Sequence, residues 1–449
     1  MSLAIPAVVA FLLTAILTPL SRDLCRRFGW VDHPNRRKLH RAPVPRAGGI
    51  AIFLGYAAAM SLRSQWAILP AVLAAFGTGF LDDLVGLKPR TKIAGQLIAA
   101  LLACGAGVQI LGTGVWWHIP LTIIWLVGCT NAVNLIDGLD GLAAGVGLFA
   151  ALAAIGAGHA SLTAVAAPLL GALLGFLLYN VSPASIFMGD CGSNTVGFLL
   201  GCFGVMWSSR TESLAGMSAP IIALAIPILD TALAIFRRFL RNEPIFAADR
   251  GHIHHRLLAH GFSPLQVAAI LYTGAGFFAG LSVLLANGTF SRGPVLAAFA
   301  VVIWLALRYL RYDEFDSVRR VIFGGFLRRA LSADLVLREF EDTIRMARSV
   351  EECWCALEDH GRRLGLSGAS MQVYGRMFSA PFRETETPRD CWTLRVPLNG
   401  AAFVEFEAPF GAGTPVLPLT ESLRNVLAPK LETLRPLMTF AAAAGRRTR

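Results

Sequence analysis

The sequence has few charged residues and no paired-cysteine motif, and both shortages restrict what the protein can be. Only 15% of its 449 residues are charged, whereas 55% are hydrophobic. This balance excludes an ordinary soluble protein and indicates an integral membrane protein. The eight cysteines are scattered and form no Cys-x-x-Cys pair. We therefore expect reduced or buried thiols rather than a disulfide scaffold or a cysteine metal site.

The first apolar run lacks the charge order of a cleaved secretory signal. No basic residue precedes the run from Leu3 to Leu20, whereas Arg22, Arg26 and Arg27 follow it. A secretory signal carries its positive charge in front and a small-residue cleavage site behind. We therefore expect this run to stay in the protein as a transmembrane helix with its N-terminus outside.

Further apolar runs predict an all-α polytopic membrane protein with about eleven transmembrane helices, each near the roughly 20 residues that cross a bilayer. The formal charge is +11, and the basic residues gather in alternate loops at 22–46, 88–92 and 237–256. By the positive-inside rule, these loops and the C-terminus are cytoplasmic. The positive charge then faces anionic lipids or substrates, not nucleic acid. The runs after the first are 48–62, 66–81, 93–111, 116–129, 142–156, 161–178, 195–207, 220–235, 265–285 and 294–307.

The composition changes after about Asp313, where charged and apolar residues alternate as in a soluble domain. Their spacing predicts a helix, two strands and a closing helix. We expect a membrane domain over residues 1–312 and a small cytoplasmic α/β domain over 313–449, for which a GAF-like fold is one hypothesis. The segments are Val336, Phe340, Ile344 and Ala347 for the first helix, 391–398 and 401–407 for the strands, and 421–438 for the closing helix.

A polar stretch between two apolar runs is the most informative part of the chain. Asn131, Asn134, Asp137 and Asp140 are spaced by three, between the run that ends at Cys129 and the one that begins after them. A carboxylate at the centre of a bilayer costs roughly 2.5–3.5 kcal/mol. The cluster therefore belongs at the membrane–water boundary. An ordinary polar turn is the simpler alternative, but four regularly spaced polar groups favour a functional site.

Two acidic motifs lie at the ends of predicted spans on the same side. Asp82 and Asp83 are adjacent carboxylates that repel unless a cation or water is near, which favours a Mg²⁺ or general-base site over a simple helix end. Asp190 lies between Gly189 and Gly192, in a turn that presents it at the start of the next helix. That position suits both Mg²⁺ and phosphate. An Asx turn with Asp190 as a cap is an equal alternative.

Two basic loops complete the polar motifs. Lys38 and His40 lie in a Pro-stiffened cationic loop, which suits a lipid phosphate or polyphosphate better than a role in topology alone. Residues 249–257 hold three histidines and two arginines. A transition-metal site is weakened because His254 and His255 are adjacent, and a pH-sensing loop is another alternative. We favour imidazoles and guanidiniums that hold a pyrophosphate.

These clusters share the cytoplasmic face and favour Mg²⁺-assisted phosphoryl transfer to a membrane-borne acceptor. A transporter is a rival, because intramembrane carboxylates can relay protons. It predicts ionisable residues at mid-depth and repeated halves, which the sequence lacks. A membrane sensor whose working part is the C-terminal domain is a second rival.

The ordered motifs resemble one family. D-x-P-x-x-R-K-x-H, P-x-P-R-x-G-G, the D-D pair, N-A-x-N-x-x-D-G-x-D-G-L, M-G-D-x-G-S and H-I-H-H-R-L follow one another within about residues 1–311. Together they are similar to the bacterial polyprenyl-phosphate N-acetylhexosamine-1-phosphate transferases, the WecA/TagO branch of the MraY superfamily. The extension after about Asp313 departs from the simplest members.

The resemblance implies transfer of a sugar 1-phosphate from a UDP-N-acetylhexosamine to undecaprenyl phosphate, with release of UMP. This would be the first membrane step of a cell-envelope polysaccharide pathway, at the cytoplasmic face of the bacterial inner membrane. Mg²⁺ would be the cofactor, with Mn²⁺ able to substitute, and a homodimer is one arrangement that the sequence leaves open. The H-I-H-H-R-L motif favours UDP-GlcNAc over UDP-MurNAc-pentapeptide, the substrate of the alternative phospho-MurNAc-pentapeptide transferase.

The resemblance also implies roles for single residues. Asp190 would be the principal Mg²⁺ ligand with Asn134 nearby, and Asp82 or Asp83 would place or deprotonate the lipid phosphate. The remaining catalytic positions would be Asp137 and Asp140, which shape the nucleotide site, and His252, which holds phosphate. The other binding residues would be Lys38 and His40 at the cytoplasmic entrance, Asn131, His254, His255 and Arg256.

Two routes for the transfer stay open at this stage. The lipid phosphate can attack the β-phosphorus directly, or an aspartate can attack first and form a phospho-enzyme. We favour the direct route, because a phosphate oxygen is already anionic at neutral pH.

Overall fold

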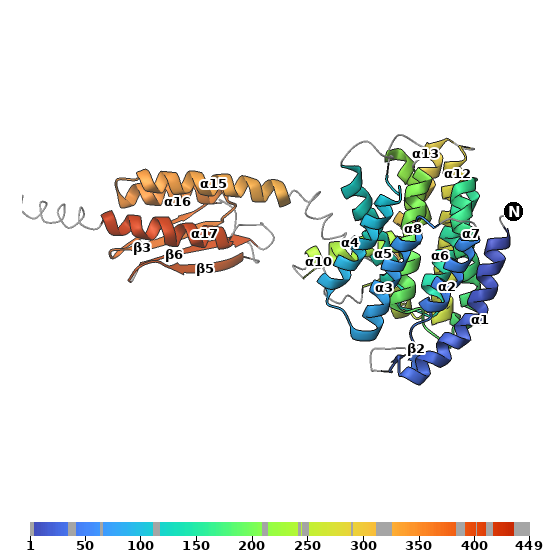
Figure 1. Ribbon diagram of the computed structural model, residues 1–449. Coiled ribbons are helices and arrows are strands. Elements are labelled where there is room, and N and C mark those ends of the chain that lie inside the picture. The colour runs from blue at the N-terminus through green and yellow to red at the C-terminus, as the bar shows by residue number, and fades with distance from the viewer. Residues whose placement is uncertain are drawn as a thin grey trace, which may run out of the picture. The chain divides into compact units, whose positions relative to one another are not determined.

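The computed structural model describes residues 4–34, 42–62, 66–110, 117–208, 214–240, 244, 251–288, 291–310, 326–382, 391–400, 402–409 and 416–434. The chain divides into two compact units, Met1–Tyr312 and Asp313–Arg449 (Figure 1).

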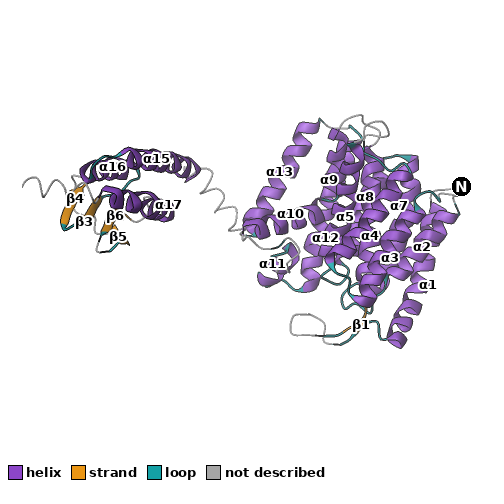
Figure 2. Ribbon diagram, turned by 60° about the vertical axis from the view of Figure 1, so that its left-hand side comes forward, coloured by secondary structure: helices purple, strands orange, loops and turns teal. Residues whose placement is uncertain are grey.

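The first unit is a helical bundle (Figures 1 and 2). One small antiparallel pair, β1 (Val31–Asp32) and β2 (Val44–Pro45), lies in it. The helices are α1 (Ala4–Phe28), α2 (Gly49–Ser61), α3 (Leu69–Val85), α4 (Pro89–Gly105), α5 (His118–Ile136), α6 (Leu142–Gly156), α7 (Ala160–Asn180), α8 (Gly189–Ser208), η1 (Leu214–Met217), α9 (Ser218–Ala223), α10 (Ala225–Leu240), α11 (Ile253–Ala259), α12 (Pro264–Ala286) and α13 (Arg292–Tyr309).

The bundle is that of a multi-pass membrane protein. Among the described residues, five helices are long and apolar enough to cross a membrane, namely α1, α5, α7, α12 and α13, or six if one bent pair counts as a span. The helices α2 and α6 are apolar but shorter. Each predicted apolar run overlaps a helix, although the run 93–111 extends past the end of α4 at Gly105. The total of about eleven spans and the N-outside orientation stay predictions.

One predicted span is broken in the structure. The run 220–235 was expected to be a single helix, but α9 ends at Ala223, and the two helical parts on either side of Leu224 are bent by 95°. Pro227 explains the break: proline lacks an amide hydrogen, and its ring conflicts with the carbonyl four residues earlier, which belongs to Ala223. The second part, α10, therefore runs in a new direction.

Helix α8 lies at the centre of the bundle. It is buried continuously from Cys191 to Val205 and packs against α2, α3 and α5, as expected of a helix that is apolar on all sides. Glycines allow the closest approaches. A Cβ atom on Gly49 would lie 2.1 Å from the amide nitrogen of Gly192, and one on Gly79 would lie 2.2 Å from the carbonyl oxygen of Asp190. The helices α2 and α3 therefore meet the start of α8 backbone to backbone.

We expect Gly79→Ala to destabilise the protein. The added methyl group meets backbone atoms of Asp190, which cannot rotate away, so α3 and α8 must separate, at about 1–3 kcal/mol. The melting temperature in detergent should fall, and the site described below should lose activity. Gly77→Ala is the matched control on the same helix, because a Cβ there meets nothing within 4 Å. Equal melting temperatures for the two variants would contradict the close contact.

The second unit is a four-stranded antiparallel sheet with helices on one face (Figures 1 and 2). The strand order is β4-β3-β6-β5. Val404, Phe406 and Ala408 alternate on β6 as buried residues and pack with the helices. The elements are α15 (Phe326–Met346), α16 (Val350–Arg363), β3 (Gly368–Val373), β4 (Arg376–Pro381), β5 (Cys391–Pro397), β6 (Phe403–Pro409), α17 (Val416–Ser422) and the π-helical turn η2 (Leu423–Leu427).

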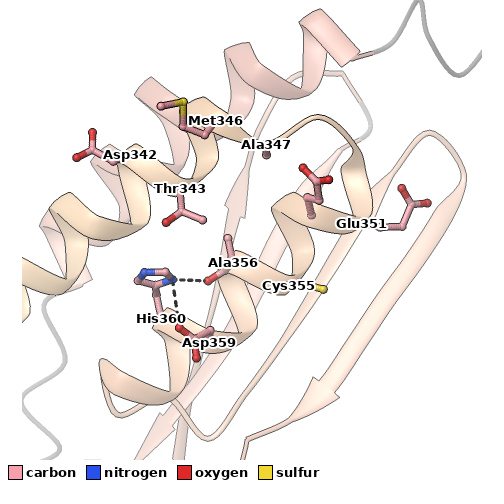
Figure 3. Close-up of a pocket in the computed structure, with 10 residues that line it drawn as sticks. Asp342, Thr343, Met346, Ala347, Glu351, Cys355, Ala356, Asp359 and His360 are labelled. Atoms are coloured by element: carbon pink, nitrogen blue, oxygen red, sulfur yellow. Dashed lines mark hydrogen bonds and ion pairs between the residues drawn. The ribbon is translucent and has the colours of Figure 1, made fainter.

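The sequence predicted part of this unit. The helical spacing from Val336 to Ala347 falls on α15 and its end, and those four residues are buried. The predicted strands coincide with β5 and β6, whereas β3 and β4 were not predicted. An acidic groove of about 770 Å³ lies between α15 and α16, and its lining includes Asp342, Glu351 and Asp359 (Figure 3). A GAF-like fold stays a prediction.

Candidate active site

Asp190 is held at the first turn of α8 by two side chains, those of Asn134 and Lys92. Its Oδ1 accepts a hydrogen bond of 3.0 Å from Asn134 Nδ2, and its Oδ2 lies 2.7 Å from Lys92 Nζ. The same amide nitrogen of Asn134 donates to Ser193 Oγ at 2.8 Å. Because α5 continues to Ile136, Asn134 lies on a helix, not in the polar loop that the sequence suggested. The helix gives this side chain a fixed direction toward α8.

Lys92 is a central residue that the sequence analysis did not single out. Its Nζ lies 2.8 Å from Asp82 Oδ2, 2.7 Å from Asp190 Oδ2 and 3.3 Å from Asn134 Oδ1. One ammonium group therefore joins three motifs that are far apart in the sequence. A signal was available: Lys92 lies in the first turn of α4, where the helix dipole disfavours a cation.

The two adjacent carboxylates have different environments. Asp83 is only 2% exposed and accepts from the backbone amides of Asp190 and Cys191 at 3.0 and 2.9 Å, which caps the start of α8. Arg46 also donates to it, from Nε at 3.1 Å and from a terminal nitrogen at 2.9 Å. Asp82 accepts from the Leu87 amide at 2.7 Å and pairs with Lys92 through its other oxygen. Both oxygens of each carboxylate are therefore engaged, but Asp82 is 11% exposed, against 2% for Asp83.

The charges near Asp190 favour its ionised form. Burial alone would raise the pKa of this carboxyl, but hydrogen bonding with Asp82, the positive charge of Lys92 and the amide of Asn134 lower its pKa to about 2. Asp190 is therefore ionised at neutral pH. Burial, together with the charges of Asp190 and Asp83, raises the pKa of Asp137 well above its usual range.

A cavity of about 780 Å³ opens beside these residues. Its size lies in the range of small-molecule sites, roughly 300–1,000 Å³. Four of the predicted site residues line it, together with Arg46 and the segment 182–184. The four are Asp137, Asp140, Asp190 and His255. Asp140 also accepts from the backbone amide of Ala184 at 3.0 Å, which holds that segment at the cavity wall.

The histidine motif lies at α11 and the residue before it. His252 is buried and places Nδ1 3.0 Å from Asp230 Oδ2. His254 is also buried, and burial lowers its pKa to about 4, so its ring is neutral near pH 7. A Cβ on Gly138 would lie 2.7 Å from its Nε2, so it borders the cavity wall. Of the three histidines, His255 is the one that lines the cavity among the described residues.

Some predicted binding residues are held elsewhere or lie outside the described residues. Arg256 donates to the backbone carbonyls of Gly251 and Leu310, and Asn131 exchanges hydrogen bonds with Gln96. Neither is among the residues that line the cavity. Lys38 and His40 fall on residues that the structure does not describe. Their binding roles stay predictions.

The oxygen ligands around Asp190 fit Mg²⁺ in part. In the described part of the chain, no three His, Cys, Asp or Glu side chains are arranged to hold a metal ion by themselves. Mg²⁺, however, is commonly bound through one or two carboxylates together with substrate phosphates and water. An ionised Asp190 at the cavity wall supplies one such carboxylate, whereas the oxygen of Asn134 is directed at Lys92 Nζ. A site of this kind is completed by the substrate.

Comparisons with known proteins match this arrangement to one family. Residues 65–208 match the model of glycosyl transferase family 4. A probable undecaprenyl-phosphate N-acetylglucosaminyl 1-phosphate transferase of Bacillus subtilis is 34% identical over 320 residues, which cover 67% of this chain and 89% of the relative. A decaprenyl-phosphate N-acetylglucosaminephosphotransferase of Mycobacterium tuberculosis is 36% identical over 326 residues, 62% of this chain and 81% of the relative.

A relative of a different specificity is also similar. A phospho-N-acetylmuramoyl-pentapeptide-transferase of Halalkalibacterium halodurans is 30% identical over 321 residues, which cover 63% of this chain and 97% of the relative. All three relatives carry names that describe transfer of a phosphosugar.

Proposed function

The chain belongs to glycosyl transferase family 4, and from that we propose that it transfers N-acetylglucosamine 1-phosphate from UDP-GlcNAc to undecaprenyl phosphate. The names of the Bacillus and Mycobacterium relatives support a polyprenyl-phosphate acceptor and GlcNAc as the sugar. The observation that carries the proposal is an ionised Asp190, fixed by Lys92 and Asn134 at the wall of a nucleotide-sized cavity. The reaction would open a cell-envelope polysaccharide pathway at the cytoplasmic face of the inner membrane.

The chemistry is a single displacement at phosphorus. An oxygen of the lipid phosphate forms a bond to the β-phosphorus of UDP-GlcNAc, and the bond from that phosphorus to the bridging oxygen breaks. The bridging oxygen keeps the electron pair and leaves with UMP. Mg²⁺, held by Asp190 with Asn134 beside it, would supply positive charge to the diphosphate.

The structure supports different roles for the two adjacent aspartates. Asp83 is 2% exposed and accepts from two backbone amides at the start of α8 as well as from Arg46, so it is the less accessible of the two carboxylates. Its role is to hold the start of α8, and with it Asp190. We assign the placing of the lipid phosphate, or the removal of its proton, to Asp82, which is 11% exposed.

The phospho-enzyme route is tested separately. After addition of UDP-GlcNAc with a radiolabelled β-phosphate and no lipid, the direct route predicts an unlabelled protein. An acid-labile aspartyl-phosphate that forms under these conditions, and disappears when undecaprenyl phosphate is added, would overturn the direct route.

The proposed function is tested by UMP release from purified protein with undecaprenyl phosphate, UDP-GlcNAc and Mg²⁺. We expect release that requires the lipid and is lost in Asp190→Ala. Release with UDP-MurNAc-pentapeptide instead would keep the chemistry and favour the specificity named for the Halalkalibacterium relative. If no UDP-sugar gives UMP, the proposed transferase function is wrong, and a membrane sensor becomes the better hypothesis.

Chelation provides a test of the metal. We expect EDTA to abolish UMP release, and excess Mg²⁺ or Mn²⁺ to restore it. The described residues that line the cavity include four aspartates and, as the one arginine or lysine, Arg46, so they supply little positive charge to a diphosphate. Lipid-dependent UMP release that survives exhaustive chelation would show that no divalent cation is needed. A mock-treated sample, dialysed without EDTA, controls for loss of lipid during handling.

A further inference from the structure

Asp230 joins α10 to the start of α11, a connection that the proposed mechanism does not use. It belongs to α10, the helix that follows the 95° bend, and it is 1% exposed. A carboxylate this deeply buried is stable only when it is hydrogen-bonded or paired. Its partners are two consecutive residues, His252 and Ile253, at the start of α11.

The contacts use both carboxylate oxygens. Oδ2 lies 3.0 Å from Nδ1 of His252, and Oδ1 accepts from the backbone amide of Ile253 at 2.8 Å. The side chain of His252, the N-cap residue of α11, makes no capping hydrogen bond to the backbone of that helix. Asp230 therefore fixes both the backbone position and the ring orientation of His252 from a different helix.

Such a contact also selects the tautomer of the imidazole. A carboxylate accepts from Nδ1–H, which leaves Nε2 of His252 as the nitrogen free to accept or exchange a proton. The ring of His252 lies parallel to that of His254, with centroids 5.8 Å apart. His254 in turn borders Gly138 at the cavity wall, and His255 lines the cavity. The orientation of His252 thus sets the position of the whole histidine segment beside the cavity.

We propose that Asp230 is a positioning residue of the transferase, which holds His252 in the Nδ1–H tautomer and thereby aligns residues 252–255 along the nucleotide-diphosphate site. The inference rests on the proposed function for its kinetic consequence, but the hydrogen bond itself can be measured without activity. Asp230 does not line the cavity. It acts through the histidines.

The kinetic test is a double-mutant cycle. Asp230→Asn keeps the shape but replaces one acceptor by an amide, and we expect kcat to fall by about 10- to 100-fold, as for other residues that orient a ligand-binding histidine. In a His252→Ala background the same change should have almost no further effect, because the residue it orients is gone. If the two substitutions instead reduce kcat by independent factors that multiply in the double mutant, Asp230 acts through folding alone and the proposal is overturned.

Thr231→Val is the matched control on the same helix. Thr231 is adjacent, and its buried hydroxyl has no hydrogen-bond partner in the described part of the chain. We expect an unchanged kcat and an unchanged KM for UDP-GlcNAc. A loss equal to that of Asp230→Asn would show that any change in α10 disturbs the site, and would contradict a specific role.

Nitrogen-15 NMR of histidine-labelled protein provides the test that needs no turnover. The His252 signals are assigned by their absence in His252→Ala. We expect a protonated, hydrogen-bonded Nδ1 in the wild type, and a shift or loss of that signal in Asp230→Asn. An Nε2–H tautomer in the wild type overturns the proposal even if Asp230→Asn fails to fold. If the wild type releases no UMP, the proposed function fails while this measurement still decides the role of Asp230.

Discussion

Replacing Asp190 by asparagine should reduce UMP release by about 100- to 1,000-fold, the range for removal of a group that stabilises transition-state charge. The amide keeps one acceptor oxygen but loses the negative charge that faces the cavity, pairs with Lys92 and would hold Mg²⁺. Because Lys92 retains Asp82 as a partner, the melting temperature should change little. The loss should therefore appear in kcat, measured as UMP release with saturating lipid and UDP-GlcNAc.

Asp359→Asn is a suitable control for that experiment. It makes the same chemical change in the second unit, at the groove between α15 and α16, and should leave the rate at the wild-type value. If the rate for Asp190→Asn is within a few-fold of the wild-type rate, the reaction does not depend on this carboxylate. The charge cluster would then be structural, and another oxygen ligand would have to be sought.

Replacing Lys92 by methionine should have the second large effect, on stability as well as on rate. Lys92 is 16% exposed and is the cation between Asp82 and Asp190. Removal of one member of a buried ion pair leaves its partners uncompensated and typically costs about 3–5 kcal/mol. We expect a lower melting temperature in detergent and a loss of UMP release, because the two carboxylates then repel each other.

Added Mg²⁺ distinguishes this explanation from general damage to the fold. If the vacated carboxylates can share a divalent cation, Mg²⁺ should raise the melting temperature of Lys92→Met by more than that of the wild type. Lys88→Met, which replaces an exposed lysine at the N-cap of the same helix, α4, should show no such difference. A Lys92→Met protein as stable as the wild type, with or without Mg²⁺, would contradict the arrangement of charges described above.

The sequence predicted those features that depend on local pattern. Apolar runs placed the helices because burial in a bilayer demands long uninterrupted hydrophobic segments. The ordered motifs identified the family and placed Asp190 beside Asn134. The same rule failed at residues 220–235, because hydropathy does not register the missing amide of Pro227 and the bend that follows. In the second unit, the alternation of Ala369, Met371 and Val373 was a usable strand signal for β3.

The residues that were not predicted act through contacts between distant elements. Arg46 pairs with Asp83 across 37 positions, and Lys92 joins Asp190 across 98. Asp230 on α10 contacts His252 across 22 positions. Spacing along a chain carries no information about which helices become neighbours, so a lone lysine or aspartate in an apolar stretch stayed unremarked.

The glycine contacts at the start of α8 also determine which wall of the cavity can move. Gly49 and Gly79 bring α2 and α3 directly against the backbone of Gly192 and Asp190, with no side chain between them. Those two helices therefore cannot shift along α8 without disrupting the site. Any rearrangement of the cavity is therefore expected in its other lining segments, which include 182–184 and His255. Asp83 and Asp190, which are joined at the start of α8, would keep their positions while those segments move.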